Sequence, residues 1–184
     1  MAKLENRYAN ALLELSAEGN TWEADLADAK LVKEILDSSE VQAFLMHPHI
    51  SNSDKQNLLH KTFNEKISDN MMGFLYLMIR KSRESTIVPA LIEFMIHANR
   101  QLGRIEARVV SAIELTKDHL ETIRKSLKNQ LGMDIMMTHI IDPDVIGGFY
   151  IMVDGRIFDG TVRNELNMMK ERLKRGGYIG ASST

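Results

Sequence analysis

The stretch Gly103-Arg104-Ile105-Glu106-Ala107-Arg108-Val109 marks the point at which the hydrophobic pattern of this 184-residue chain changes. Within it, apolar residues alternate with Glu106 and Arg108, which is the two-residue period of a half-exposed β-strand. Before it, apolar residues recur every three or four positions, as on one face of a helix. The sequence therefore predicts an α+β protein with two domains: a six-helix bundle over residues 1–103 and a small α/β domain over residues 104–184.

Six helices are predicted before the change of pattern. The fifth is apolar on nearly every side, which is typical of a central helix. Two interpretations of this helix stay open: it is simply core, or part of it lines a groove for a helix of another protein. Ser53 is expected to begin the fourth helix, Pro48 to end the third, and Gly103 to end the sixth. The predicted helices cover residues 4–19, 22–36, 39–47, 53–63, 69–80 and 85–102.

The second half alternates between strand and helix patterns. A helix is expected from the N-cap Thr116 to Gly132. Strands are expected over residues 135–141, 149–153 and 156–158, with Asp154-Gly155 as a two-residue hairpin turn between the last two. A final helix carries the apolar stripe Val162, Leu166, Met169 and Leu173.

Composition excludes several classes of protein. The 23 basic and 25 acidic residues give a net charge of −2, so no overall positive field is available to bind nucleic acid. The chain has no cysteine, which excludes disulfides, thiolate metal sites and cysteine nucleophiles. No apolar run approaches the roughly 20 residues of a membrane span. We expect a soluble protein whose membrane association comes only through a partner.

Candidate catalytic and metal sites are weak. Proline in His47-Pro48-His49 is expected to hold the chain extended and to direct the two rings apart, so a solvated loop is favoured over a metal site. Asp142-Pro143-Asp144 begins like a calcium loop, but Val153 occupies the position of the required glutamate. Asp142, Asp144, Asp154 and Asp159 are expected in turns rather than as a catalytic pair, and no histidine is associated with a serine nucleophile. The sequence predicts no active site, no metal and no cofactor.

The last predicted helix is locally basic. A solvated face is the simplest interpretation. The alternative is a small RNA- or ribosome-associated factor that uses this face, which would bind with a steep salt dependence. Its basic residues are Arg163, Lys170, Arg172, Lys174 and Arg175, against Glu165 and Glu171.

Two motifs resemble a known family. Arg7-Tyr8-Ala9-Asn10-Ala11-Leu12 is similar to the Arg-Tyr-Ala-x-Ala-Leu opening of the delta subunit of bacterial ATP synthase, a family that includes the mitochondrial oligomycin-sensitivity-conferring protein. The segments Asp142-Pro143-Asp144-Val145-Ile146-Gly147-Gly148-Phe149 and Asp159-Gly160-Thr161-Val162 resemble its Asp-Pro-x-x-Ile-Gly-Gly-Phe and Asp-Gly-Ser-Val signature. Lys81-Ser82-Arg83 departs from the more usual Asn-Gly-Arg. Order, spacing and length agree over essentially the whole chain.

The resemblance implies a non-catalytic stator subunit, present in a single copy per complex. In the family, the N-terminal bundle lies on the catalytic head and binds the N-terminal helix of an alpha subunit between its first and fifth helices. The C-terminal domain holds the b subunits of the peripheral stalk, and the assembly resists rotor torque during proton-coupled ATP synthesis. The implied location is the cytoplasmic face of the bacterial cell membrane, peripheral through the complex, with no membrane insertion and no nucleic acid.

The resemblance also assigns residues. Ala9 and Ala11 are small enough to let a second helix approach the first one closely. The predicted groove residues are Tyr8, Ala9, Ala11, Leu12, Leu15, Phe74, Leu75, Met78 and Ile79. The signature residues, assigned to strand geometry rather than to catalysis, are Asp142, Pro143, Ile146, Gly147, Gly148, Asp159 and Gly160.

Overall fold

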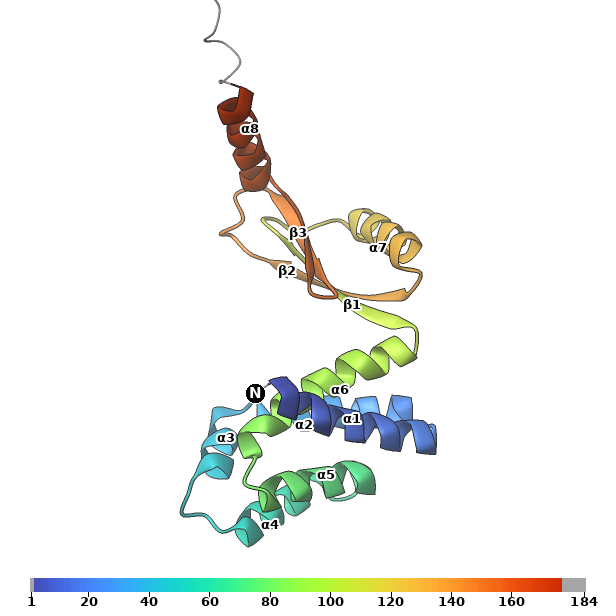
Figure 1. Cartoon of the computed structure of the whole chain (residues 1–184), viewed down its shortest axis with the longest axis vertical. Helices are drawn as coiled ribbons and strands as arrows, with labels where there is room; N and C mark the ends of the chain where they lie inside the picture. The colour runs from blue at the N-terminus through green and yellow to red at the C-terminus, as the bar shows by residue number, and fades with distance from the viewer. Residues whose placement is uncertain (1, 177–184) are drawn as a thin grey trace, which may run out of the picture. The chain divides into compact units, whose positions relative to one another are not determined.

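The computed structural model describes residues 2–176, and the chain divides into two compact units, Met1–Leu102 and Gly103–Thr184 (Figure 1). This boundary lies one residue before the one expected from the change of pattern. Gly103 has a φ of +70°, the left-handed conformation expected of a glycine that follows a helix.

The first unit is helical and contains all six predicted helices. A short 3₁₀ turn, η1 (Glu84–Thr86), precedes the last helix, so that Pro89 falls in the first turn, where its missing N–H costs nothing. The helices are α1 (Ala2–Gly19), α2 (Trp22–Leu36), α3 (Ser39–Met46), α4 (Asn52–Phe63), α5 (Asp69–Arg80) and α6 (Ile87–Gln101).

The start of α4 differs from the prediction. The N-cap is Ser51, whose hydroxyl accepts a hydrogen bond from the backbone N–H of Asp54 at 3.1 Å. Ser53 lies inside the helix. Both serines are good caps, and the apolar period alone does not choose between them.

The bundle core contains Phe63, Leu75, Leu91 and Phe94, which are almost completely buried. Helix α1 packs mainly along α6, and α4 packs on α5. Burying each of these large side chains contributes roughly 1.5–3 kcal/mol to folding. A buried ion pair joins α4 to η1, with Lys55 Nζ 2.7 Å from a carboxylate oxygen of Glu84.

The second unit contains a four-stranded sheet in the order β2-β1-β3-β4. The strands β1 (Arg104–Ser111) and β2 (Asp134–Ile141) are parallel and are joined by α7 (Lys117–Leu131). The strands β3 (Gly148–Val153) and β4 (Arg156–Thr161) form an antiparallel hairpin, and β3 pairs antiparallel with β1. The helix α8 (Val162–Gly176) follows β4 without an intervening residue.

Local signals in this unit match the predictions, with one correction. Thr116 caps α7, Gly132 ends it at φ +68°, and Asp154 and Gly155 have the positive φ angles of a tight hairpin turn. The last strand extends to Thr161, so Asp159 lies in a strand and not in the predicted turn. Alternate residues of the strands form a core with Leu127 of α7: Ile105, Ala107, Val109, Ile135, Ile151 and Val153.

Candidate partner-binding surfaces

The helices α1 and α5 meet at an aromatic contact. The rings of Tyr8 and Phe74 lie edge to face, with centroids 6.5 Å apart and planes at 70°. This geometry brings the positive ring edge against the negative ring face. Phe74 is 6% exposed and Tyr8 is half-buried. The contact therefore marks the line along which the two helices meet at the surface, which we call the α1–α5 seam.

Most of the predicted groove residues lie beneath this seam. Six of the nine are buried in the lone chain, so they support the two helices rather than present side chains to a partner. The buried residues are Ala9, Leu12, Phe74, Leu75, Met78 and Ile79. The residues that reach the surface are Tyr8, Ala11 and Leu15, the last of them 40% exposed.

The surface residues of α1 share one face. Tyr8, Ala11 and Leu15 are separated by three and four positions, so they follow one stripe along the helix. On α5, Leu77 is half-buried and follows Phe74 by three positions, which places it on the same edge. Gly73 precedes Phe74, is exposed, and has open space where a Cβ would lie. Leu77 and Gly73 do not stand out in the sequence, because a helix that is apolar on nearly every side does not indicate which edge is exposed.

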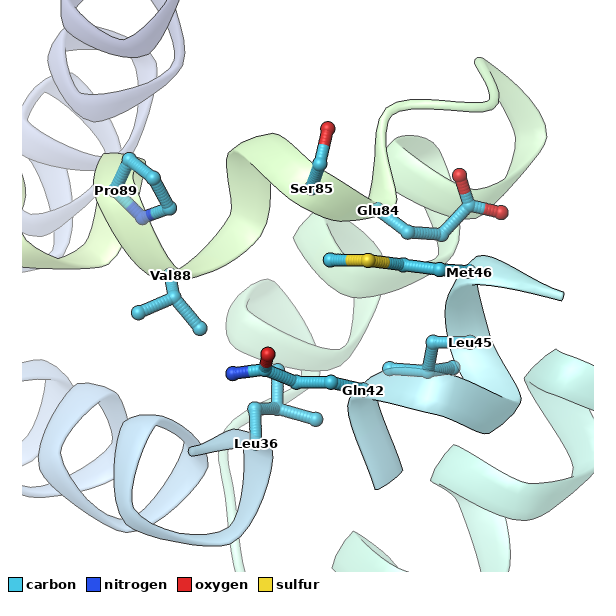
Figure 2. A pocket seen from close by; sticks show the side chains of 8 residues that line it. All are labelled: Leu36, Gln42, Leu45, Met46, Glu84, Ser85, Val88 and Pro89. Carbon is cyan, nitrogen blue, oxygen red and sulfur yellow. The ribbon is translucent and has the colours of Figure 1, made fainter. Parts of the chain in front are cut away.

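A pocket of about 220 Å³ lies elsewhere in the first unit (Figure 2). It is formed by the end of α2, by α3, and by the η1–α6 segment. Its wall is mainly apolar, and Glu84, the partner of Lys55, is one of the lining residues. The lining residues are Leu36, Gln42, Leu45, Met46, Glu84, Ser85, Val88 and Pro89.

The second unit has an exposed apolar stripe on α8. Val162, Leu166 and Met169 are 42%, 60% and 58% exposed, and their spacing of four and three places them on one face. Ile146, in the loop before β3, is 74% exposed. The predicted fourth member of the stripe, Leu173, has a side chain outside the described part of the structure. A cluster of exposed large apolar side chains is typical of an interaction surface.

Charged groups border the α8 stripe. Lys170, Arg172 and Lys174 are exposed, and Lys174 Nζ lies 3.0 Å from a carboxylate oxygen of Glu171. The stripe is therefore an apolar surface with mixed charge along its sides, as is usual for a helix that binds another helix.

The signature residues surround the start of α8. Gly148 has a φ of +77°, and a Cβ at this position would lie 2.4 Å from the carbonyl oxygen of Gly160. Backbone therefore approaches closely at Gly148, whereas a Cβ on Gly147 would meet the side chain of Val162. The hydrogen bonds that Asp159 accepts, first from the backbone N–H and then from the side chain of Thr161, hold the pKa of its carboxyl below the ordinary value.

The second unit also brings together a serine and a histidine that the sequence did not associate. Ser111 Oγ lies 2.7 Å from His139 Nε2. The hydroxyl hydrogen of Ser111 is donated to the carbonyl oxygen of Ile113 at 2.6 Å, so the histidine must donate and the serine must accept. A general base would need the opposite direction. This pair therefore stabilises the ends of β1 and β2.

The rings of His47 and His49 lie close to each other, although the sequence predicts that they point apart. Their ring centroids lie 5.5 Å apart, because the backbone N–H of His49 donates to His47 Nδ1. Over residues 2–176, the structure contains no group of three or more histidine, cysteine or acidic side chains arranged to hold a metal ion. In the same residues, no helix has both the length and the apolar character of a membrane span.

Comparisons with known proteins identify the family. An ATP synthase subunit delta from Desulforamulus reducens is 34% identical over 91% of this chain and 93% of its own length. One from Clostridium perfringens is 34% identical over 94% and 97%. The fold resembles a chain of the Toxoplasma gondii mitochondrial ATP synthase hexamer, with a TM-score of 0.78, 21% identity, and coverage of 92% and 97%. Residues 4–173 match the family described as ATP synthase delta (OSCP) subunit, and the chain therefore belongs to that family.

Proposed function

We propose that this chain is the stator subunit that links the top of the alpha/beta catalytic head of a rotary ATP synthase to the b subunits of the peripheral stalk. It resists rotor torque during ATP synthesis and has no catalytic activity of its own. The observation that carries this proposal is that the exposed apolar stripe of α8 and the α1–α5 seam lie in two different units. A protein with two such surfaces can hold two partners at once.

The stripe of α8 is proposed to bind the peripheral stalk. Leu166 and Met169 leave more than half of their side-chain surface in water, which is unfavourable unless a partner covers them. An amphipathic helix of a b subunit would cover the stripe, and acidic residues beside its apolar face would meet Lys170, Arg172 and Lys174.

The α1–α5 seam is proposed to bind the N-terminal helix of an alpha subunit. Tyr8, Ala11 and Leu15 would contact that helix from α1, and Leu77 and Gly73 from α5. The small side chains of Ala11 and Gly73 allow close approach of a helix backbone. The six buried residues among the predicted groove residues would not touch that helix. They would contribute by fixing the spacing of α1 and α5.

Mechanical load sets the requirements on both surfaces. A stator must not dissociate under torque, so its contacts need slow dissociation, which well-packed apolar anchors provide. Two linked binding sites also raise the effective concentration of the second partner once the first is bound. We place the chain at the membrane as a peripheral part of the complex.

The family match leaves the RNA- or ribosome-associated alternative without support. The two functions respond differently to salt. Binding to phosphates weakens steeply as the salt concentration rises, whereas apolar helix binding changes little.

Two substitutions, one on each proposed surface, test the proposal. The full-length chain is used to capture partners from membrane extract, and alpha and b subunits are quantified. Ala11→Asp should lose alpha subunits and keep b subunits, since it places a charge in the α1–α5 seam. Leu166→Glu should do the reverse.

Matched controls are available on the same helices. Ala17→Asp changes an exposed alanine of α1 off the seam stripe, and Asn167→Glu changes an exposed residue of α8 off the apolar stripe. Both should capture both partners, and circular dichroism should show unchanged helicity for all four variants. Normal capture of alpha subunits by Ala11→Asp, or of b subunits by Leu166→Glu, would contradict the corresponding assignment.

A further inference from the structure

The junction between β4 and α8 contains no linker, because Thr161 ends the strand and Val162 begins the helix. A helix attached in this way has its direction set by the few hydrogen bonds at its first turn. Those bonds come from two separate parts of the chain: the end of β4, and the loop of residues 142–147 that joins β2 to β3.

The first set of bonds comes from the end of β4. The backbone N–H of Thr161 donates to Asp159 Oδ1 at 2.9 Å. The side-chain amide of Asn164 donates to the backbone carbonyl of Asp159 at 2.9 Å, and the backbone N–H of Asn164 donates to Thr161 Oγ1 at 3.3 Å. Thr161 is 9% exposed, so its hydroxyl is held in place by packing as well. Thr161 thus caps the helix, and Asn164 ties the first turn back to the strand.

The second set joins α8 to the segments before β3. The backbone N–H of Val162 donates to the carbonyl of Gly147 at 3.1 Å, and the guanidinium of Arg163 donates to the carbonyl of Asp144 at 3.4 Å. The backbone N–H of Asp144 donates in turn to Asp142 Oδ1 at 3.0 Å. The signature residues of both motifs therefore meet at the base of one helix.

The glycines allow these segments to approach. A Cβ on Gly147 would lie 3.1 Å from Val162 Cγ2, and a Cβ on Gly148 would lie 2.4 Å from the Gly160 carbonyl oxygen. A larger residue at position 148 would force the backbone of β3 and β4 apart beside the start of α8, and one at position 147 would crowd the side chain of Val162.

We infer that Asp159 and Asn164 are positioning residues that hold α8 in a fixed direction on the sheet, so that the C-terminal unit presents its apolar stripe as a rigid arm. The role of the arm in stalk binding rests on the proposed function; the fixed direction does not. An α-helix of 15 residues is about 22 Å long. A 10° change at its base moves its far end by about 4 Å, enough to separate side chains in contact.

Distance measurements between two spin labels test this inference without any partner. The chain has no cysteine, so Lys125→Cys on α7 and Lys170→Cys on α8 give a unique pair of exposed labelling sites. The parent protein should give one narrow distance distribution. Asn164→Ala and Asp159→Ala should each broaden it to roughly twice that width or more, because the helix base is released.

Two controls separate positioning from general stability. Asn167→Ala changes the same residue type one turn further along α8 and should leave the distribution narrow. Asp159→Asn keeps an oxygen that can accept from Thr161 and should also restore the narrow distribution. If Asp159→Ala fails to fold, Asn164→Ala, which removes a single side-chain bond, decides the question.

The outcomes of the two tests are distinct. A broad distribution in the parent protein, or a narrow one in Asn164→Ala, overturns the rigid-arm inference and leaves the proposed function standing. A narrow parent distribution together with normal capture of b subunits by Leu166→Glu overturns the proposed stalk surface and leaves the rigid arm standing.

Discussion

The ring of Tyr8 on α1 meets the ring of Phe74 on α5 edge to face at a centroid distance of 6.5 Å. Phe74 belongs to the buried core and Tyr8 borders the surface, so one contact joins the interior of the bundle to its proposed head-binding seam. The stability of the bundle and its affinity for the head should therefore depend in part on the same pair.

A double-mutant cycle measures this coupling. We expect Tyr8→Leu and Phe74→Leu to be non-additive by about 0.5–1.5 kcal/mol in the free energy of unfolding, which is the usual value of an aromatic pair beyond its burial. Urea unfolding followed by circular dichroism gives the four free energies. Tyr8→Leu combined with Tyr150→Leu, which lies in the other unit, serves as the control cycle and should be additive.

Burial divides the predicted groove residues into those that stabilise the bundle and those that can contact a partner. Leu75→Ala should lower the free energy of unfolding by about 2–5 kcal/mol because it leaves a cavity in the core. Leu15→Ala should cost about 0.5 kcal/mol or less, since its side chain is 40% exposed, yet it should weaken binding to alpha subunits. The free energy of unfolding and the capture of alpha subunits are measured for both variants. Equal losses of stability would show that the burial assignment is wrong.

The glycine at the base of α8 is expected to be irreplaceable. Gly148→Ala combines a positive φ with a backbone clash at 2.4 Å, whereas Gly155→Ala has a similar φ of +70° and open space around it. We expect both variants to lose stability and Gly148→Ala to lose clearly more, because only there must the backbone move. The difference in melting temperature between the two variants measures the effect of the backbone clash. Equal melting temperatures would contradict the prediction.

The stability of the second unit should depend on acidic pH through Asp159. The bonds from Thr161 keep the pKa of this carboxyl below its ordinary value of 3.8. The ionised form is therefore favoured in the folded state, so its contribution is present above pH 3.8 and is lost as the pH falls through the folded-state pKa. Asp159→Asn should flatten the loss of stability below about pH 4. Asp118→Asn, which changes an exposed aspartate on α7, controls for net charge.

Local chemistry in the sequence predicts much of this fold. Gly132 and the Asp154-Gly155 turn were recognisable because each supplies a positive φ that few residues tolerate. The change of period at Arg104 located the unit boundary to within one residue, since strands and helices repeat differently.

Other features depend on contacts between distant residues. The start of α4 was misplaced because Ser51 and Ser53 are equally good caps until the flanking backbone is known. The bond between Ser111 and His139 arises from the parallel register of β1 and β2, which no local pattern encodes. The candidate groove includes buried residues because α5 is apolar on nearly every side, and only its neighbours in the fold decide which edge stays exposed.

Glu84 takes part in two features of the bundle: its carboxylate binds the ammonium of Lys55 at 2.7 Å, and the residue is one of those that line the 220 Å³ pocket beside α3. Because Lys55 already neutralises that carboxylate, Glu84 offers no free charge to a ligand. Most of the remaining lining is apolar. A small-molecule screen against the bundle should therefore be weighted toward neutral, apolar compounds.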